Sequence, residues 1–148
     1  MHFTTLFVLK NKTLEDLSHY DIEDMFSDRF CYYYGETTPK YKRWCDWFQI
    51  GGRWCDILKA KKGIHCERRW SNDNVPVVEG EYSIVNIHDL TEPLPRDEIY
   101  SVATKSKIIL KNYDWNYGNV DEEKFNQLLD DIDNKKFKGI IALIDCHD

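Results

Sequence analysis

Three consecutive residues near the end of the chain, Asp145-Cys146-His147, have side chains that take part in acid–base and nucleophilic chemistry. They follow an apolar run, Ile140–Ile144, which predicts a fully buried strand. Because side chains alternate along a strand, we expect Asp145 and His147 on one face and Cys146 on the other. Asp145 and His147 could then act as an orienting group and a base. The alternative is structural, with Cys146 buried in the core and its two neighbours making polar contacts at the sheet edge.

A second candidate is the turn Gly51-Gly52-Arg53, which aromatic residues flank. Two glycines let the backbone approach a ligand closely and can present amide donors to an anion. Arg53 offers a bidentate fork for phosphate or carboxylate, and an indole ring offers a face for a stacked base. The two motifs together predict a nucleotide site made of Gly51, Gly52, Arg53, Trp47, Trp54, Asp145 and His147. The alternative is a tight turn over a Trp-rich core, with Arg53 paired to a nearby aspartate.

Charge is distributed unevenly along the 148 residues, whose net charge is -6. Residues 40–70 hold nine basic and three acidic side chains, a net charge of +6, and four of the five Trp. The remaining residues hold 11 basic and 23 acidic side chains, a net charge of -12. Lysine and arginine interleaved with Trp are typical of nucleic-acid contact, which would place Lys40, Lys42, Lys61, Lys62, Arg68 and Arg69 in one exposed patch. Because the acidic majority would repel a polyanion, we do not expect direct nucleic-acid binding.

The acidic side chains gather in two segments, residues 15–28 and 121–133. Such clusters are commonly solvated faces. The alternative is a docking surface for the positive, nucleic-acid-binding groove of another protein, because complementary charge accelerates association. This interpretation assigns the partner contacts to Glu23, Asp24, Asp130, Asp131 and Asp133.

The cysteines, at positions 31, 45, 55, 66 and 146, are odd in number and contain no Cys-x-x-Cys pair. The first 15 residues lack the basic start and cleavage site of a signal peptide, so we expect reduced thiols and a cytoplasmic location. Zinc ligands usually occur in pairs two to four residues apart, and we therefore predict no metal site and no cofactor. No apolar run of about 18 residues exists, which predicts no membrane span.

A chain of this length with 42% hydrophobic residues can form one domain, residues 1–148. Strands are predicted at 3–10, 44–50, 77–88 and 140–144, a hairpin at 99–111, and helices at 13–26 and 121–136. The first helix would begin at Thr13, with Asp16 completing a capping box. In the second, Phe125, Leu128, Leu129 and Ile132 are spaced at i, i+3, i+4 and i+7. This order predicts an α+β fold with a mainly antiparallel sheet and both helices packed on one face, for which a ferredoxin-like arrangement is one natural solution.

The segment from Pro39 to Trp54, PKYKRWCDWFQIGGRW, resembles a signature P-K-(x)-K-W-D-W-Y-x-I-G-G-R-W. That signature belongs to a family of uncharacterised proteins from phages, prophages and mobile elements. The ending Ala142–His147 is similar to the V-D-C-H with which those proteins close. The chain departs from the family at two positions. Cys45 lies between Trp44 and Asp46 and interrupts the family's Trp-Asp-Trp run, and Asp148 stands where the family ends in an apolar residue.

The resemblance implies a phage or mobile-element setting and little chemistry. Together with the acidic segments, it leads us to expect a small accessory protein in the host cytoplasm. This protein would bind and block a host defence protein that targets nucleic acid, as an anti-CRISPR inhibitor does. The alternative function is a nucleotide-binding or nucleotide-processing enzyme with its site at the Gly-Gly-Arg turn and the closing Asp-Cys-His.

Overall fold

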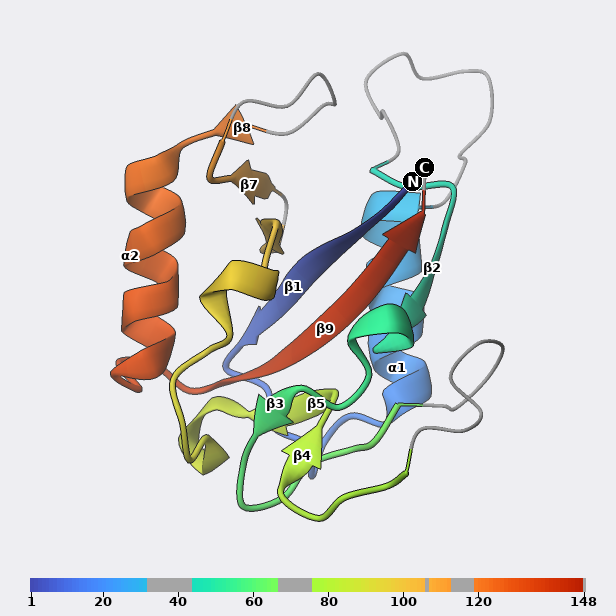
Figure 1. Ribbon diagram of the computed structural model, residues 1–148, viewed down its shortest axis with the longest axis vertical. Helices are drawn as coiled ribbons and strands as arrows, with labels where there is room; N and C mark the ends of the chain where they lie inside the picture. The colour runs from blue at the N-terminus through green and yellow to red at the C-terminus, as the bar shows by residue number, and fades with distance from the viewer. Residues whose placement is uncertain (32–43, 67–75, 106, 113–118, 148) are drawn as a thin grey trace.

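The computed structural model describes residues 1–31, 44–66, 76–105, 107–112 and 119–147, and a mixed seven-stranded sheet forms its centre (Figure 1). Its strands are β1 (His2–Lys10), β2 (Trp47–Ile50), β5 (Ile84–Asn86), β6 (Ser101–Ala103), β7 (Ile108–Leu110), β8 (Asn119–Val120) and β9 (Gly139–His147). They lie in the order β2-β9-β1-β6-β7-β8, and β5 also pairs with β9. The pairs β1–β6 and β7–β8 are parallel and the others antiparallel, which confirms the predicted α+β fold with a mainly antiparallel sheet. A second, two-stranded sheet joins β3 (Leu58–Lys59) to β4 (Glu81–Tyr82).

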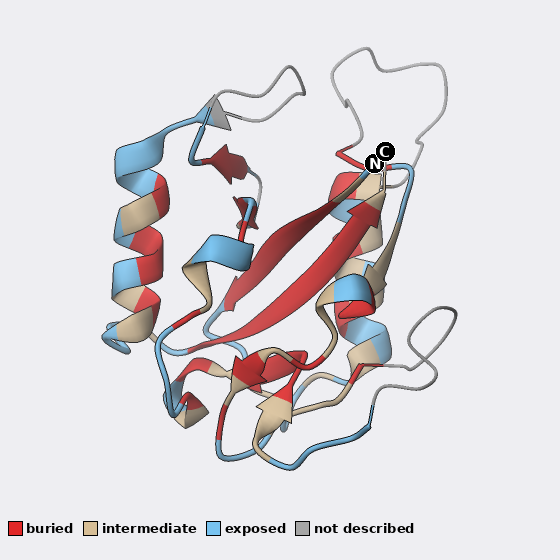
Figure 2. Ribbon diagram, viewed as in Figure 1, coloured by how far each residue is buried: buried red, intermediate tan, exposed pale blue. Residues whose placement is uncertain are grey.

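The central ladder of the sheet joins the first strand of the chain to the last. β1 and β9 pair over nine residues, from His2 opposite His147 to Lys10 opposite Gly139. Figure 2 shows both strands buried over most of their length, as the apolar run in β9 predicted. The ladder therefore places the closing Asp-Cys-His beside the start of the chain.

The helix α2 (Glu122–Asp133) forms where the apolar spacing predicted it. Its residues Phe125, Leu128, Leu129 and Ile132 are all buried. They pack in one core with Leu6 and Val8 of β1 and with Ile141 and Leu143 of β9. The side chain of Asp121 accepts a hydrogen bond from the Lys124 backbone and caps the first turn.

The helix α1 (His19–Phe26) begins later than we expected. Its N-cap is Ser18, which forms a capping box with Asp21. The Thr13 hydroxyl donates to the Asp16 carboxylate over 3.1 Å, but this pair belongs to a turn that precedes the helix. The helix buries Ile22 and Phe26.

The two helices cover opposite faces of the sheet, which differs from the prediction that both pack on one face. Phe26 of α1 packs with Phe3 and Phe7 of β1, whereas α2 packs with the alternate residues of the same strand. The reason is that β1 and β9 are apolar on both faces, so each face needs a cover. The more specific ferredoxin-like arrangement stays a prediction.

Four of the cysteines form disulfides, so the expectation of reduced thiols is wrong for them. Cys31 is bonded to Cys45, with Cα atoms 5.3 Å apart, and Cys55 to Cys66, with Cα atoms 5.7 Å apart. Both separations lie in the usual range for a disulfide. Disulfides persist in oxidising surroundings, so the cytoplasmic location stays a prediction. In the described part of the chain, no helix is long and apolar enough to cross a membrane.

Candidate functional site

A row of three rings crosses one end of the sheet. His2, His147 and Trp47 occupy paired positions on β1, β9 and β2, so their side chains share a face. The His2 and His147 ring centroids lie 5.0 Å apart, and the Trp47 indole stacks on His147 at 4.9 Å. The Nδ1 atom of His147 is buried and has no hydrogen-bond partner among the described residues. Trp47 remains 47% exposed and forms the outer side of the row.

Asp145 is a buried carboxylate on the same face, two residues before His147. One of its oxygens lies 2.7 Å from Nδ1 of His2, and the other accepts a hydrogen bond from the Arg53 backbone N–H over 2.9 Å. These contacts satisfy a group that would be costly to bury alone. We predicted that Asp145 would orient His147, but the structure pairs it with His2, which lies 143 residues away in the sequence. No local sequence pattern marks His2 as part of the site.

The Gly-Gly-Arg turn folds directly over Asp145. Gly51 and Gly52 have φ angles of 77° and 50°, and Gly52 begins the 3-10 turn η2 (Gly52–Trp54). A Cβ atom at Gly52 would overlap the Asp145 carboxylate, so a glycine is needed there. The segment after the glycines does not resume as a hairpin partner of β2, because its strand β3 pairs with β4. The turn thus presents the Arg53 amide to Asp145, whereas we expected its amides to face an external anion.

The remaining predicted ligand residues lie around this turn. The Arg53 side chain is exposed and makes no ion pair within the described ranges, so the predicted pairing with an aspartate is not observed. Gly51 faces away from Asp145, and a Cβ there would meet Cys66 and Ser83. Trp54 is held by a hydrogen bond of 3.0 Å from its indole N–H to the Glu98 carboxylate.

A pocket of about 400 Å³ lies beside the His2–Asp145 pair. Its lining includes His2 and Thr4 of β1, Trp54 of η2, Glu98, Tyr100 and Lys111. Thr4 donates to the Glu98 carbonyl oxygen and accepts from the Tyr100 backbone N–H, which fixes this wall of the pocket. Both sequence motifs are therefore adjacent to the pocket. Asp145 of the Asp-Cys-His ending contacts His2, which lines the pocket. Trp54, which also lines it, is the last residue of the Gly-Gly-Arg turn.

Cys146 lies on the opposite face of β9 from Asp145, as the alternation predicted. It is completely buried, and its sulfur lies 3.4 Å from the Thr5 hydroxyl. Burial raises the pKa of the Cys146 thiol well above its ordinary value. The thiol therefore stays protonated and is not a nucleophile for the site, which fits the structural interpretation of this residue.

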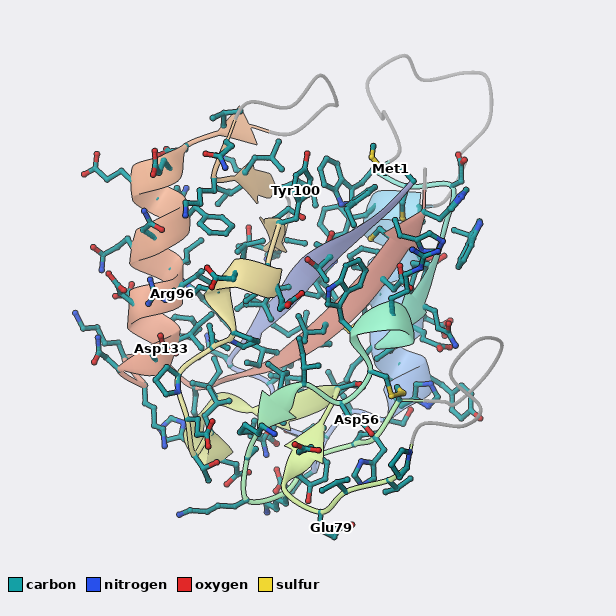
Figure 3. The ribbon with its side chains drawn as sticks, viewed as in Figure 1. Met1, Asp56, Glu79, Arg96, Tyr100 and Asp133 are labelled. Atoms are coloured by element: carbon teal, nitrogen blue, oxygen red, sulfur yellow. A yellow bond between two sulfur atoms is a disulfide. The ribbon has the colours of Figure 1, made fainter. Side chains whose placement is uncertain are left out.

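The predicted acidic docking residues lie on two helices that cover opposite faces of the sheet. Arg96 points toward Asp133 (Figure 3) and donates to it over 2.9 Å and to Asp130 over 2.5 Å. Asp131 accepts from Gln127 and lies 3.7 Å from Lys136. On α1, Glu23 lies 3.1 Å from the His19 ring nitrogen, and Asp24 is exposed. Internal cations thus pair with Asp130, Asp131 and Asp133, the three α2 residues assigned to the partner contact.

Two further predictions concern nucleic acid and metals. In the proposed basic patch, residues 40, 42, 68 and 69 lie outside the described residues, and Lys61 and Lys62 are exposed.

Cys55, Asp56 and Cys66 place potential metal ligands within 4.8 Å of one another. Their two sulfur atoms are bonded to each other, and Asp56 accepts hydrogen bonds from the Cys66 backbone and the Ser83 hydroxyl. Asp56 therefore forms hydrogen bonds beside the Cys55–Cys66 disulfide.

No family model, curated protein or solved structure matches this chain. The resemblance to a family of phage and mobile-element proteins stays a prediction.

Proposed function

We propose that the chain binds a nucleotide-like ligand in the pocket beside His2 and that His2 exchanges a proton with it. The observation that supports this most is the 2.7 Å contact between His2 and the buried carboxylate of Asp145 at the pocket. This proposal takes up the alternative function and transfers the role of base from His147 to His2.

The acid–base role follows from the way Asp145 holds His2. A carboxylate at Nδ1 selects the tautomer in which that nitrogen carries the proton, which leaves Nε2 as the atom that accepts one. The Arg53 amide fixes Asp145 from its other side, so the pair is held in place before a ligand arrives. Contact with the His147 ring further restricts the orientation of His2. A base with this support can act on a hydroxyl or water bound in the pocket.

The ligand class follows from the other walls of the pocket. Trp54 and Tyr100 supply aromatic surface, and a planar base can stack on such rings. Lys111 is exposed at the pocket and supplies a positive charge that suits a phosphate, and the lining also holds the acids Asp97 and Glu98, the second of which accepts the Trp54 indole N–H. A volume of about 400 Å³ is in the range of small-molecule sites.

The test is titration of the full chain with AMP, followed by NMR of the indole N–H signals. We expect the Trp54 signal to shift and Trp54→Ala to weaken AMP binding about tenfold, as loss of a stacked base does. His2→Gln should keep AMP binding but abolish any turnover of nucleotide esters, whereas His88→Ala, at an exposed histidine elsewhere, should change neither. The absence of any AMP-dependent shift at Trp54 would contradict the ligand class. Turnover that survives in His2→Gln would contradict the proton transfer.

The blocking of a host defence protein stays our second proposal and carries less structural support. It depends on the resemblance to phage proteins and on the net charge of -6. Asp130, Asp131 and Asp133 of α2 are paired with cations of the chain, so the exposed Asp24 of α1 and Asp28, which follows that helix, are the better contacts for a basic partner.

A further inference from the structure

A second pocket lies at the other end of β1 from His2. It has a volume of about 460 Å³ and is lined by residues 8–12 at the end of β1, Met25 and Arg29, Thr104 and Lys105, and Lys124 and Leu128 of α2. A strand rises about 3.3 Å per residue, so Lys10 is roughly 26 Å from His2 along β1. The two pockets are therefore separate sites.

All charged side chains that line this pocket within the described part of the chain are positive. They are the five cations Lys10, Lys12, Arg29, Lys105 and Lys124. This is unusual for a chain with 26 acidic and 20 basic residues. Cations gathered without acids create a positive potential that attracts an anion.

These cations are not committed to acidic partners. In the described residues none of the five takes part in an ion pair, whereas Lys59, Arg96 and Lys136 do. Lys10 lies 4.6 Å above the Phe137 ring and Arg29 lies 5.9 Å from the Phe7 ring, contacts that position a cation and leave its charge in place. The pocket thus has the unneutralised charge that an anion site needs.

The floor of the pocket is apolar. Val8, Leu9, Met25 and Leu128 contribute to it, and three of these four are buried. Inorganic phosphate would use only the charged rim, whereas an organic phosphate would also cover this floor. Ligand pockets commonly combine an apolar lining with a few polar groups that fix orientation.

The ends of two parallel strands meet at this pocket. β1 and β6 are parallel neighbours, so their carboxyl ends lie at one edge of the sheet, where residues 10–12 and 104–105 line the pocket. Met25 and Arg29 line it from one side, and Lys124 and Leu128 of α2 complete its lining.

We propose that this pocket binds a small organic polyphosphate, with its phosphates among the five cations and its apolar part on the floor. The inference is independent of the site at His2, because it rests on different residues at the other end of the strand. The limited volume of about 460 Å³ favours a small molecule over a nucleic-acid strand, which would need an extended surface.

The test titrates the full chain carrying Trp54→Ala, which weakens the site beside His2, with ATP and with inorganic tripolyphosphate by calorimetry. We expect both to bind, and ATP to bind several-fold more tightly because only ATP covers the apolar floor. Lys105→Glu and Lys124→Glu should each raise the Kd for both probes about tenfold, the effect of losing one charge-assisted contact. The matched control is Lys61→Glu, which changes the net charge equally at an exposed lysine outside the pocket.

Three results would overturn the proposal. The first is that neither ATP nor tripolyphosphate binds. The second is that Lys61→Glu weakens probe binding as much as the pocket variants do. The third is that a short single-stranded oligonucleotide binds more tightly than ATP, with the same dependence on Lys105 and Lys124. Circular dichroism of each variant excludes a loss of folding. Trp54→Ala should weaken AMP binding beside His2 and leave ATP binding at this pocket unchanged, whereas Lys105→Glu should do the reverse, so failure of one site is distinguishable from failure of the other.

Discussion

The two ends of β1 support different chemistry, although one strand contributes to both. At the His2 end, a buried carboxylate, two imidazoles and an indole contact one another, and each position depends on its neighbour. At the Lys10 end, five exposed cations surround an apolar floor, and none of them is paired with an acid of the described ranges. Acid–base chemistry needs fixed and hydrogen-bonded partners, whereas anion binding needs charge that nothing else neutralises.

This difference has a consequence for stability. Substitutions at the His2 end should destabilise the fold, because they disturb buried groups. Substitutions at the Lys10 end should affect ligand binding and leave the fold intact, because surface side chains contribute little to folding.

Gly52→Ala should have the largest effect. Its Cβ would overlap the Asp145 carboxylate, and its φ of 50° is unfavourable for alanine. We expect a loss of about 3 kcal/mol in the free energy of unfolding, measured in urea, from overpacking and backbone strain together. Gly80→Ala is the matched control, because Gly80 has a φ of 95° but its Cβ would meet no atom nearer than 4.0 Å. Equal losses in the two variants would show that the contact with Asp145 contributes nothing.

Asp145→Ala should have the next largest effect, since it removes the acceptor for both the Arg53 amide and His2. We expect a loss of about 2 kcal/mol in the free energy of unfolding from buried donors left unpaired. Asp145→Asn keeps one acceptor oxygen and should lose less than half as much. If both variants were as stable as the parent chain, the Asp145 carboxylate would not stabilise the His2 end of the sheet.

The same contrast explains which features could be predicted from the sequence. The spacing of Phe125, Leu128, Leu129 and Ile132 predicts α2, and the apolar run predicts β9, because both patterns are local. The His2–Asp145 pair is not local: it depends on the register between the first and last strands, which no short pattern encodes. The cysteine pairs and the opposite placement of the helices likewise depend on how distant segments pack.

The candidate sites divide in the same way. The residue types alone mark the Gly-Gly-Arg turn and the Asp-Cys-His ending as candidates. In the structure the turn folds over Asp145 of that ending. The basic pocket was missed, because its cations come from four separate segments. Only the topology of β1 and β6 brings Lys10 and Lys105 together.

Charge reversal on α2 should have a smaller effect, and it tests the docking interpretation. Replacing Asp130, Asp131 and Asp133 by Lys removes both carboxylates that hold Arg96. We expect a loss of about 1 kcal/mol in the free energy of unfolding, because these pairs are only partly shielded from solvent. If α2 is a docking surface, the triple variant should also bind a basic partner more weakly and with less dependence on salt. Binding that weakens only in Asp24→Lys would place the partner on α1 instead.

The smallest effect on stability is expected at the Lys10 end, where Lys105→Ala and Lys124→Ala remove exposed cations from a group of like charges. The free energy of unfolding should change by less than about 0.5 kcal/mol, and at low ionic strength it should rise, because repulsion among the cations is relieved. Added salt screens that repulsion, so the difference from the parent chain should disappear near molar salt. Urea unfolding at several salt concentrations measures this directly. A loss of stability in either variant, present at all salt concentrations, would mean that these lysines have a structural role, and the contrast between the two ends of β1 would then fail.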